Sequence, residues 1–152
     1  MSKGYSRIIV AVLFFATSFL LEIKQKIAFG WSFDLALVAI LVLPLFLDFA
    51  EFLFFGSLAF LFLKSAYPWS GPETILLIAF PVLAFLFQKL FPWQSWLEPF
   101  ILIILGLFGF YGLTNPSKFF GDIPFLFLDI FVSMIYGWII YYLFAAFAGR
   151  RT

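Results

Sequence analysis

The sequence predicts an all-α, polytopic membrane protein: one domain, a bundle of six transmembrane helices with short loops. Hydrophobic residues make up 65% of the 152 residues and charged residues only 11%, whereas soluble domains are about half apolar and about a quarter charged. A soluble domain of this length could not bury so much apolar surface. The apolar residues also form long unbroken runs, which favours helices over the alternating strands of a membrane β-barrel.

The residue types that are missing restrict the chemistry. The chain has no Cys and no His, which excludes disulfide frameworks, thiol nucleophiles, imidazole-bound zinc and the Ser-His-Asp triad. It also has no Gly-rich phosphate loop and no dinucleotide fingerprint. A net charge of +1 gives no electrostatic footprint for nucleic acid. We therefore expect no enzyme, no cofactor and no metal, with the lipid bilayer as the solvent.

The first predicted span covers about residues 7–23. A basic N-terminal segment followed by an apolar run resembles a signal peptide. However, Glu22, Lys24 and Lys26 follow directly, without a clear small-residue cleavage site. We predict a retained first helix.

The second and third spans are predicted from one apolar stretch that is too long for a single crossing. Residues 35–63 would form a helix about 44 Å long at 1.5 Å per residue, against a hydrocarbon core of about 30 Å. Two crossings joined by a tight turn fit better. We place them at about 33–47 and 50–67, with the turn at the two acids Asp48 and Glu51.

Three further spans are separated by segments rich in Pro, Gly and aromatic residues, which interrupt helices and suit the headgroup level. We place the fourth at about 73–91, with a proline inside it, the fifth at about 98–113 and the sixth at about 124–147. Residues 114–122 are predicted to form a water-exposed loop. No room is left for a domain outside the membrane.

Six spans place both termini on one side of the membrane. Basic residues flank both chain ends, and positive charge gathers on the cytoplasmic side. We therefore predict a multi-pass protein of the bacterial inner (plasma) membrane with both termini in the cytoplasm.

Two acids between the second and third spans have two interpretations. Asp48 and Glu51 stand three positions apart, so they share one helix face. They could form a cation or partner site. Alternatively they lie hydrated at the mouth of a helical hairpin and cap the third span, which the need for a turn favours.

A polar stripe is predicted on the sixth span. Ser133, Tyr136 and Gly137 follow Asp129 at offsets of four, seven and eight, so all four share one face. A charged group inside a membrane span is a functional candidate by default, and this face should point into the bundle. It either lines a cavity or meets a partner helix, or it provides an interhelical hydrogen bond that fixes packing.

Other candidate positions are explained by helix geometry. Asp34 and Glu98 each open a helix after an aromatic segment, where a carboxylate caps free backbone N–H groups. Small residues let membrane helices approach closely. On the third and fifth spans these are Gly56, Gly106 and Gly109, for which packing within the bundle is favoured over a dimer interface.

Part of this pattern resembles a known family. Asp34 begins an apolar stretch that is followed by Pro44, by the polar turn at 48–51 and by Gly56 in the third span, and Asp129 lies near the start of the last span. This arrangement resembles the bacterial rod shape-determining protein MreD family. The resemblance implies a noncatalytic membrane scaffold that holds an MreC-like partner and organises MreB filaments and peptidoglycan elongation. Partner helices would then be received by spans one, three and five.

The six-helix outline is also similar to the substrate-binding S-components of energy-coupling-factor vitamin transporters. This similarity implies an alternative function as the small-molecule-binding subunit of a transporter. Such a protein should present polar groups that converge under an extracytoplasmic loop. The nearest candidates are Asn115, Lys118 and Asp122.

Overall fold

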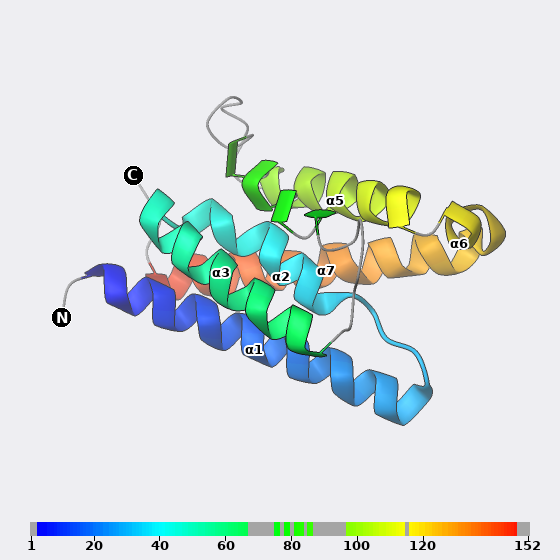
Figure 1. Cartoon of the computed structure of the whole chain (residues 1–152), viewed down its shortest axis with the longest axis horizontal. Helices are drawn as coiled ribbons and strands as arrows, with labels where there is room; N and C mark the ends of the chain where they lie inside the picture. Colours follow the sequence, from blue (N-terminus) through cyan, green and yellow to red (C-terminus); the bar gives the residue numbers. More distant parts are fainter. Residues whose placement is uncertain are drawn as a thin grey trace.

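The computed structural model is all-α, which confirms the all-α part of the predicted fold class (Figure 1). It describes residues 3–66, 75–76, 78–79, 81–83, 85–86, 97–114 and 116–148. The helices are α1 (Lys3–Phe29), α2 (Leu35–Val42), the 3-10 turn η1 (Leu43–Phe46), α3 (Phe49–Ala66), α5 (Glu98–Thr114), α6 (Pro116–Gly121) and α7 (Ile123–Ala148).

Three helices are long and apolar enough to cross a membrane: Arg7–Phe29, Phe49–Ala66 and Ile123–Phe147. Two more apolar helices, Leu35–Phe46 and Glu98–Thr114, are shorter. Six full-length transmembrane helices are therefore not shown. Most of the predicted span 73–91 and the predicted loops at 67–72 and 91–96 lie outside the described residues.

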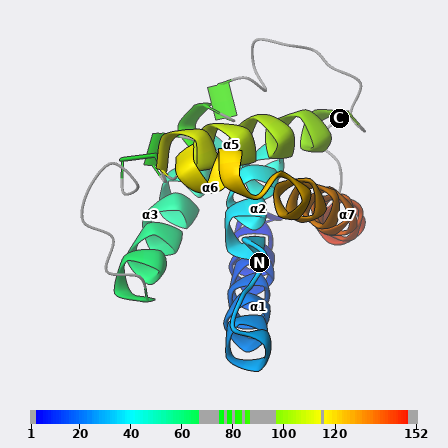
Figure 2. The ribbon, with the colours of Figure 1, turned by 90° about the vertical axis from the view of Figure 1, so that its right-hand side faces the viewer.

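α1, α3 and α5 run in one direction along the molecule and α2 and α7 in the other, so α1 begins and α7 ends at the same end (Figure 1). The turn between α2 and α3 lies at that end too, whereas the α1–α2 connection and α6 lie at the other. Viewed along its length, the molecule has α2 in the centre, with α1, α3, α5 and α7 around it (Figure 2).

The central position of α2 follows from its sequence. Every residue from Leu35 to Leu47 is buried, and a helix that is apolar all round can be enclosed by other helices without burying a polar face. The α-helix ends early because Pro44 supplies no backbone N–H, and the chain continues as the tighter turn η1. This segment is therefore shorter than the predicted crossing at 33–47.

Phenylalanine forms much of the contact between helices. The rings of Phe15 (α1) and Phe55 (α3) meet edge to face at 5.9 Å. On the other side of α2, the ring centroids of Phe46 (η1) and Phe144 (α7) lie 4.9 Å apart. Tilted aromatic pairs of this kind add to the energy of burial, so part of the phenylalanine excess serves helix packing.

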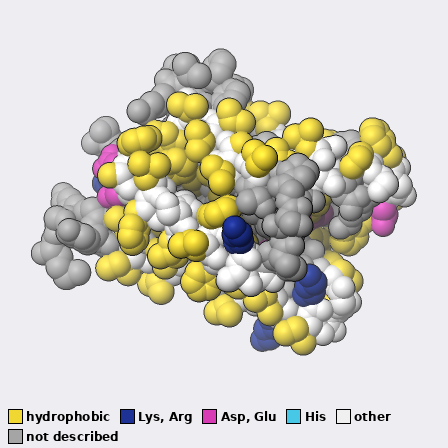
Figure 3. Space-filling view, viewed as in Figure 1, with side chains coloured by type: hydrophobic (Ala, Val, Ile, Leu, Met, Phe, Trp, Pro, Cys, Tyr) yellow, Lys and Arg dark blue, Asp and Glu magenta, His cyan; other side chains and the backbone are white. Residues whose placement is uncertain are grey.

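The outer surface is also apolar. Hydrophobic side chains spread over the described part of the face seen in Figure 3. On α7, Phe127, Phe131 and Ile135 are exposed, and their four-residue spacing places them on one outward stripe. A surface of this kind fits contact with lipid acyl chains.

The connections show one difference from prediction. Gly30 ends α1 in the left-handed conformation (φ 75°), and its N–H donates to the carbonyl of Lys26 at 3.0 Å. Residues 114–122 were predicted to be a loop, but Pro116–Gly121 forms the short helix α6. That prediction is wrong because proline at the first helical position, where its missing N–H has no partner to lose, starts a helix.

Candidate functional site: a buried polar cluster and an apolar groove

Asp34 lies at the N-cap position of α2 but does not cap it. The structure has no hydrogen bond from its side chain to the helix end, so the predicted capping role is wrong. The carboxylate contacts the hydroxyl of Tyr111 in α5 instead. This contact joins residues 77 positions apart.

The N-terminus of α2 is capped by α1. Glu22 is only 5% exposed, and its carboxylate accepts a hydrogen bond from the backbone N–H of Ala36 at 3.1 Å. One turn later, the side-chain oxygen of Gln25 accepts from the N–H of Phe33 at 3.2 Å. A negative charge at this point satisfies free N–H groups and opposes the positive end of the helix dipole. The capping acid therefore comes from a neighbouring helix, which leaves Asp34 available to α5 and α7.

Tyr111 lies between two acids. Its hydroxyl oxygen contacts Asp34 and also lies 2.5 Å from Oδ2 of Asp129 in α7. Asp129 is 2% exposed, and Ser133 Oγ donates to its other oxygen at 3.5 Å. We call Asp34, Tyr111, Asp129 and Ser133 the acid cluster. It joins the start of α2 to α5 and α7.

Two glycines allow these helices to meet. A Cβ on Gly106 (α5) would lie 2.5 Å from the side chain of Leu41 in α2. A Cβ on Gly137 (α7) would collide with Ile103 of α5 and lie 3.2 Å from Val38 of α2. A side chain at either position would require Leu41 or Ile103 to move, so both glycines serve packing inside the chain.

The predicted polar stripe of α7 lies inside the bundle. Asp129, Ser133 and Gly137 are buried and Tyr136 is half-buried. The Tyr136 hydroxyl lies 2.7 Å from Ser18 Oγ of α1. Because Ser18 gives its own proton to the carbonyl of Phe14, Tyr136 must be the donor. Ser18 and Tyr136 lie near the middle of the candidate spans Arg7–Phe29 and Ile123–Phe147, so this interhelical hydrogen bond joins the two candidate spans midway along their lengths.

Asp48 and Glu51 form a cap at the N-terminus of α3. The carboxylate of Glu51 accepts from the backbone N–H of Asp48 at 2.9 Å. This is the backward half of a capping box, in which the acid at the third helical position satisfies the N-cap N–H. Asp48 is exposed and Glu51 is buried. The pair does not reach the acid cluster.

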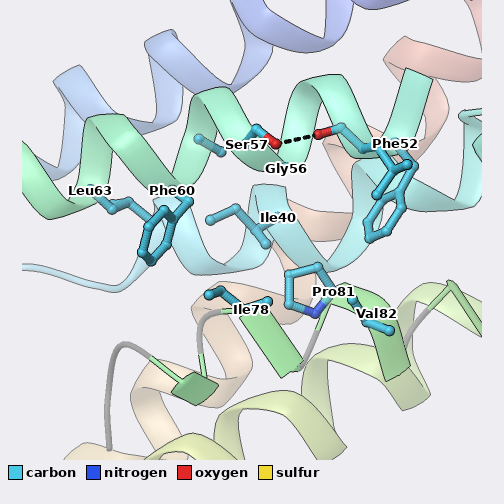
Figure 4. Close-up of a pocket in the computed structure, with 11 residues that line it drawn as sticks. Ile40, Phe52, Gly56, Ser57, Phe60, Leu63, Ile78, Pro81 and Val82 are labelled. Atoms are coloured by element: carbon cyan, nitrogen blue, oxygen red, sulfur yellow. Dashed lines mark hydrogen bonds between the residues drawn. The ribbon is translucent and has the colours of Figure 1, made fainter. Parts of the chain in front are cut away.

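A groove of about 180 Å³ lies beside α3. Figure 4 shows α3 on one side, Ile78, Pro81 and Val82 on the other and Ile40 of α2 between them. Among the described residues, no atom lies within 4 Å of a Cβ on Gly56, and Ser57 gives its proton to the carbonyl of Leu53 at 2.8 Å. The groove is lined by Ile40, Phe52, Leu53, Gly56, Ser57, Ala59, Phe60, Leu63, Ile78, Pro81 and Val82.

The remaining predicted site residues lie elsewhere. Gly109 is half-buried on α5. Glu98 is in the first turn of α5, and Asp122 is exposed at the junction of α6 and α7. Asn115 and the side chain of Lys118 lie outside the described residues. Within the described part of the chain, no three residues among Asp and Glu come together as metal ligands.

Comparisons with protein-family models, with curated proteins and with solved structures find no match. The function must therefore be inferred from residues and geometry. Two features stand out: the acid cluster, whose groups contact one another inside the bundle, and the groove beside α3, which faces outward.

Proposed function

We propose that this chain is a noncatalytic multi-pass scaffold of the bacterial inner membrane, which binds partner membrane proteins through helix contacts. The observation that carries the proposal is the groove beside α3, where no described atom lies within 4 Å of the position that a side chain on Gly56 would take.

The position of α3 supports an interface. α3 lies at one side of the bundle (Figure 2), and its Phe55 packs on Phe15 of α1. Its other face exposes Leu53, Phe54 and Leu61. One face of α3 therefore packs on the bundle, and the opposite face is turned toward the membrane. The groove lies between these two faces.

The lining of the groove suits another transmembrane helix. Small residues let two helix backbones approach closely, and membrane helix pairs gain energy from such packing. Gly56 and Ser57 provide this at the rim, and the Ser57 hydroxyl is already bonded to its own helix. The occupant we propose is therefore an apolar helix with a bulky side chain directed at Gly56.

The resemblance to the MreD family suggests which partner protein to test. It implies an MreC-like protein with a single membrane span, acting in cell shape and peptidoglycan elongation. The termini of this chain would lie in the cytoplasm. Their position at one end of the molecule (Figure 1) is what an even number of spans requires.

Capture from native membranes after crosslinking tests the scaffold. We expect the wild-type chain to recover a single-span periplasmic protein together with an actin-like filament protein. Gly56→Leu should abolish this recovery because the leucine fills the groove. Gly112→Leu is the matched control, because a Cβ on Gly112 of α5 also has no described atom within 4 Å. Equal recovery by both variants would contradict a role for the groove.

One observation favours a second candidate, the substrate-binding subunit of a small-molecule transporter. The polar side chains of the acid cluster lie near the end of the bundle opposite the termini, next to the α1–α2 connection at residues 30–34. A substrate-binding subunit would bind its ligand at this end. Recovery of a pair of ATPases with a long membrane coupling protein, in the same capture experiment, would support this function in place of the scaffold.

A further inference from the structure

In the acid cluster, the Tyr111 hydroxyl contacts two carboxyl groups but has only one hydrogen to donate. Tyr111 has a single phenolic hydrogen, yet its oxygen lies within hydrogen-bond distance of carboxyl oxygens from both Asp34 and Asp129. Each contact between two oxygens at such a distance needs a hydrogen between them. Tyr111 can donate to one carboxylate, and the other carboxyl must donate to Tyr111.

The Ser133 hydroxyl does not supply the missing hydrogen. Ser133 Oγ contacts Oδ1 of Asp129, whereas Tyr111 contacts Oδ2. The second hydrogen therefore has to reside on Asp34 or Asp129. This count depends only on the two contacts at the Tyr111 oxygen, so further partners of either carboxyl do not change it.

Charge leads to the same conclusion. Two carboxylates around one hydroxyl in a medium of low dielectric repel strongly, and such pairs hold a proton in common. The nearest acid on α1, Glu22, adds a further negative charge at the start of α2. The lysines of the same part of α1, Lys24 and Lys26, are exposed. On α7 the other titratable groups are Tyr136, which bonds to Ser18, and Tyr141 and Tyr142, which lie further along the helix. Lys118 of α6 has no described side chain.

We propose that Asp34 and Asp129 share one proton across Tyr111, so that the pair carries one negative charge and holds α2, α5 and α7 together as a pH-sensitive latch. In one arrangement Tyr111 donates to Asp129 and the protonated Asp34 donates to the Tyr111 oxygen. In the other the two acids exchange roles. Loss of the proton leaves one contact without a hydrogen and places a second charge beside the first, which separates α2 from α7.

Infrared spectroscopy of the whole chain in lipid tests the proton directly, because a protonated carboxyl has a C=O stretch that a carboxylate lacks. We expect this band in the wild type at neutral pH and its loss as the pH is raised. Asp34→Asn and Asp129→Asn should each remove this band completely. In each variant the amide N–H donates to the Tyr111 oxygen and Tyr111 donates to the remaining carboxylate, so that acid needs no proton.

Glu22→Gln is the control, because Glu22 is buried nearby but accepts its hydrogen bond as a carboxylate. It should leave the band unchanged. A wild type without the band, or a band that survives both Asp variants, would overturn the shared proton.

Thermal unfolding gives a second readout that does not depend on the variants being well folded. A folded state that holds one more proton than the unfolded state loses stability as pH rises. The wild-type Tm should therefore fall by several degrees from mildly acidic to alkaline pH, in step with loss of the band. Asp34→Asn should flatten that dependence. A wild-type Tm that rises or stays level over this range would contradict the latch. Neither outcome depends on the scaffold proposal.

Discussion

Glycine residues have different surroundings on the two sides of α2. On the α5–α7 side, Gly106 and Gly137 are closed over by Leu41 and Ile103, and the helices come close enough for Tyr111 to reach two acids. On the α3 side, no described atom lies within 4 Å of a Cβ on Gly56, which lines an apolar groove. Among the described residues, small residues on two faces of one bundle therefore have different surroundings, and we propose that the second face is left for another molecule. Only the contacts distinguish the two.

The largest effect is expected on the closed side. Gly106→Leu places a side chain where Leu41 already lies, and overpacking of a filled core costs about 1–3 kcal/mol or more. We expect a clear fall in Tm and in the yield of folded protein. Gly56→Leu should leave Tm unchanged or slightly raised, because leucine favours the helix by up to about 1 kcal/mol over glycine. Thermal unfolding of both variants in the same detergent measures this, and equal destabilisation would remove the distinction between the two sides.

Removing the Asp129 side chain should destabilise the protein more than neutralising its charge. Asp129→Ala leaves the Tyr111 and Ser133 hydroxyls with one partner fewer, at a cost of about 1–3 kcal/mol for unsatisfied buried groups. Asp129→Asn keeps an acceptor and adds a donor, so it should keep the fold. If Asp129 also serves a partner or ligand, Asp129→Asn should weaken that binding. Unchanged binding and unchanged stability in Asp129→Asn and Asp129→Ala would show that Asp129 is neither a site nor a structural contact.

The smallest effect is expected at the hydrogen bond midway along two candidate spans. The hydrogen bond between Ser18 and Tyr136 joins α1 to α7, and interhelical hydrogen bonds in membranes average about 0.6 kcal/mol. A double-mutant cycle with Ser18→Ala and Tyr136→Phe should give a coupling of that size. A coupling of zero would mean that the contact adds no stability.

Periodicity predicted part of this arrangement well. The offsets from Asp129 place Ser133, Tyr136 and Gly137 on one face, and that face is buried because a polar stripe avoids lipid. The three-residue spacing of Asp48 and Glu51, with a stretch too long for one crossing, predicted a cap and a turn at the same place. In both cases the information is local to one helix.

Contacts between distant segments could not be predicted in this way. Tyr111 is a single tyrosine in an apolar helix, which looks like an ordinary core aromatic until α2 and α7 are placed beside it. Asp34 looks like a helix cap because the sequence does not show that Glu22 of α1 already fills that role. Glu22 in turn looks like the end of the first span, because nothing local indicates that α1 continues to Phe29.

Site-specific photo-crosslinking in native membranes tests the central claim, that the α3 side of the bundle binds another helix. Leu53 lines the groove on α3 and is 50% exposed, and Leu105 on α5 is 54% exposed, so the two positions are matched in exposure. With a photoreactive residue at each, we predict a discrete adduct from position 53 to the spanning helix of another membrane protein, and only lipid adducts from position 105. Lipid adducts alone at both positions, or the same protein adduct from both, would contradict the claim.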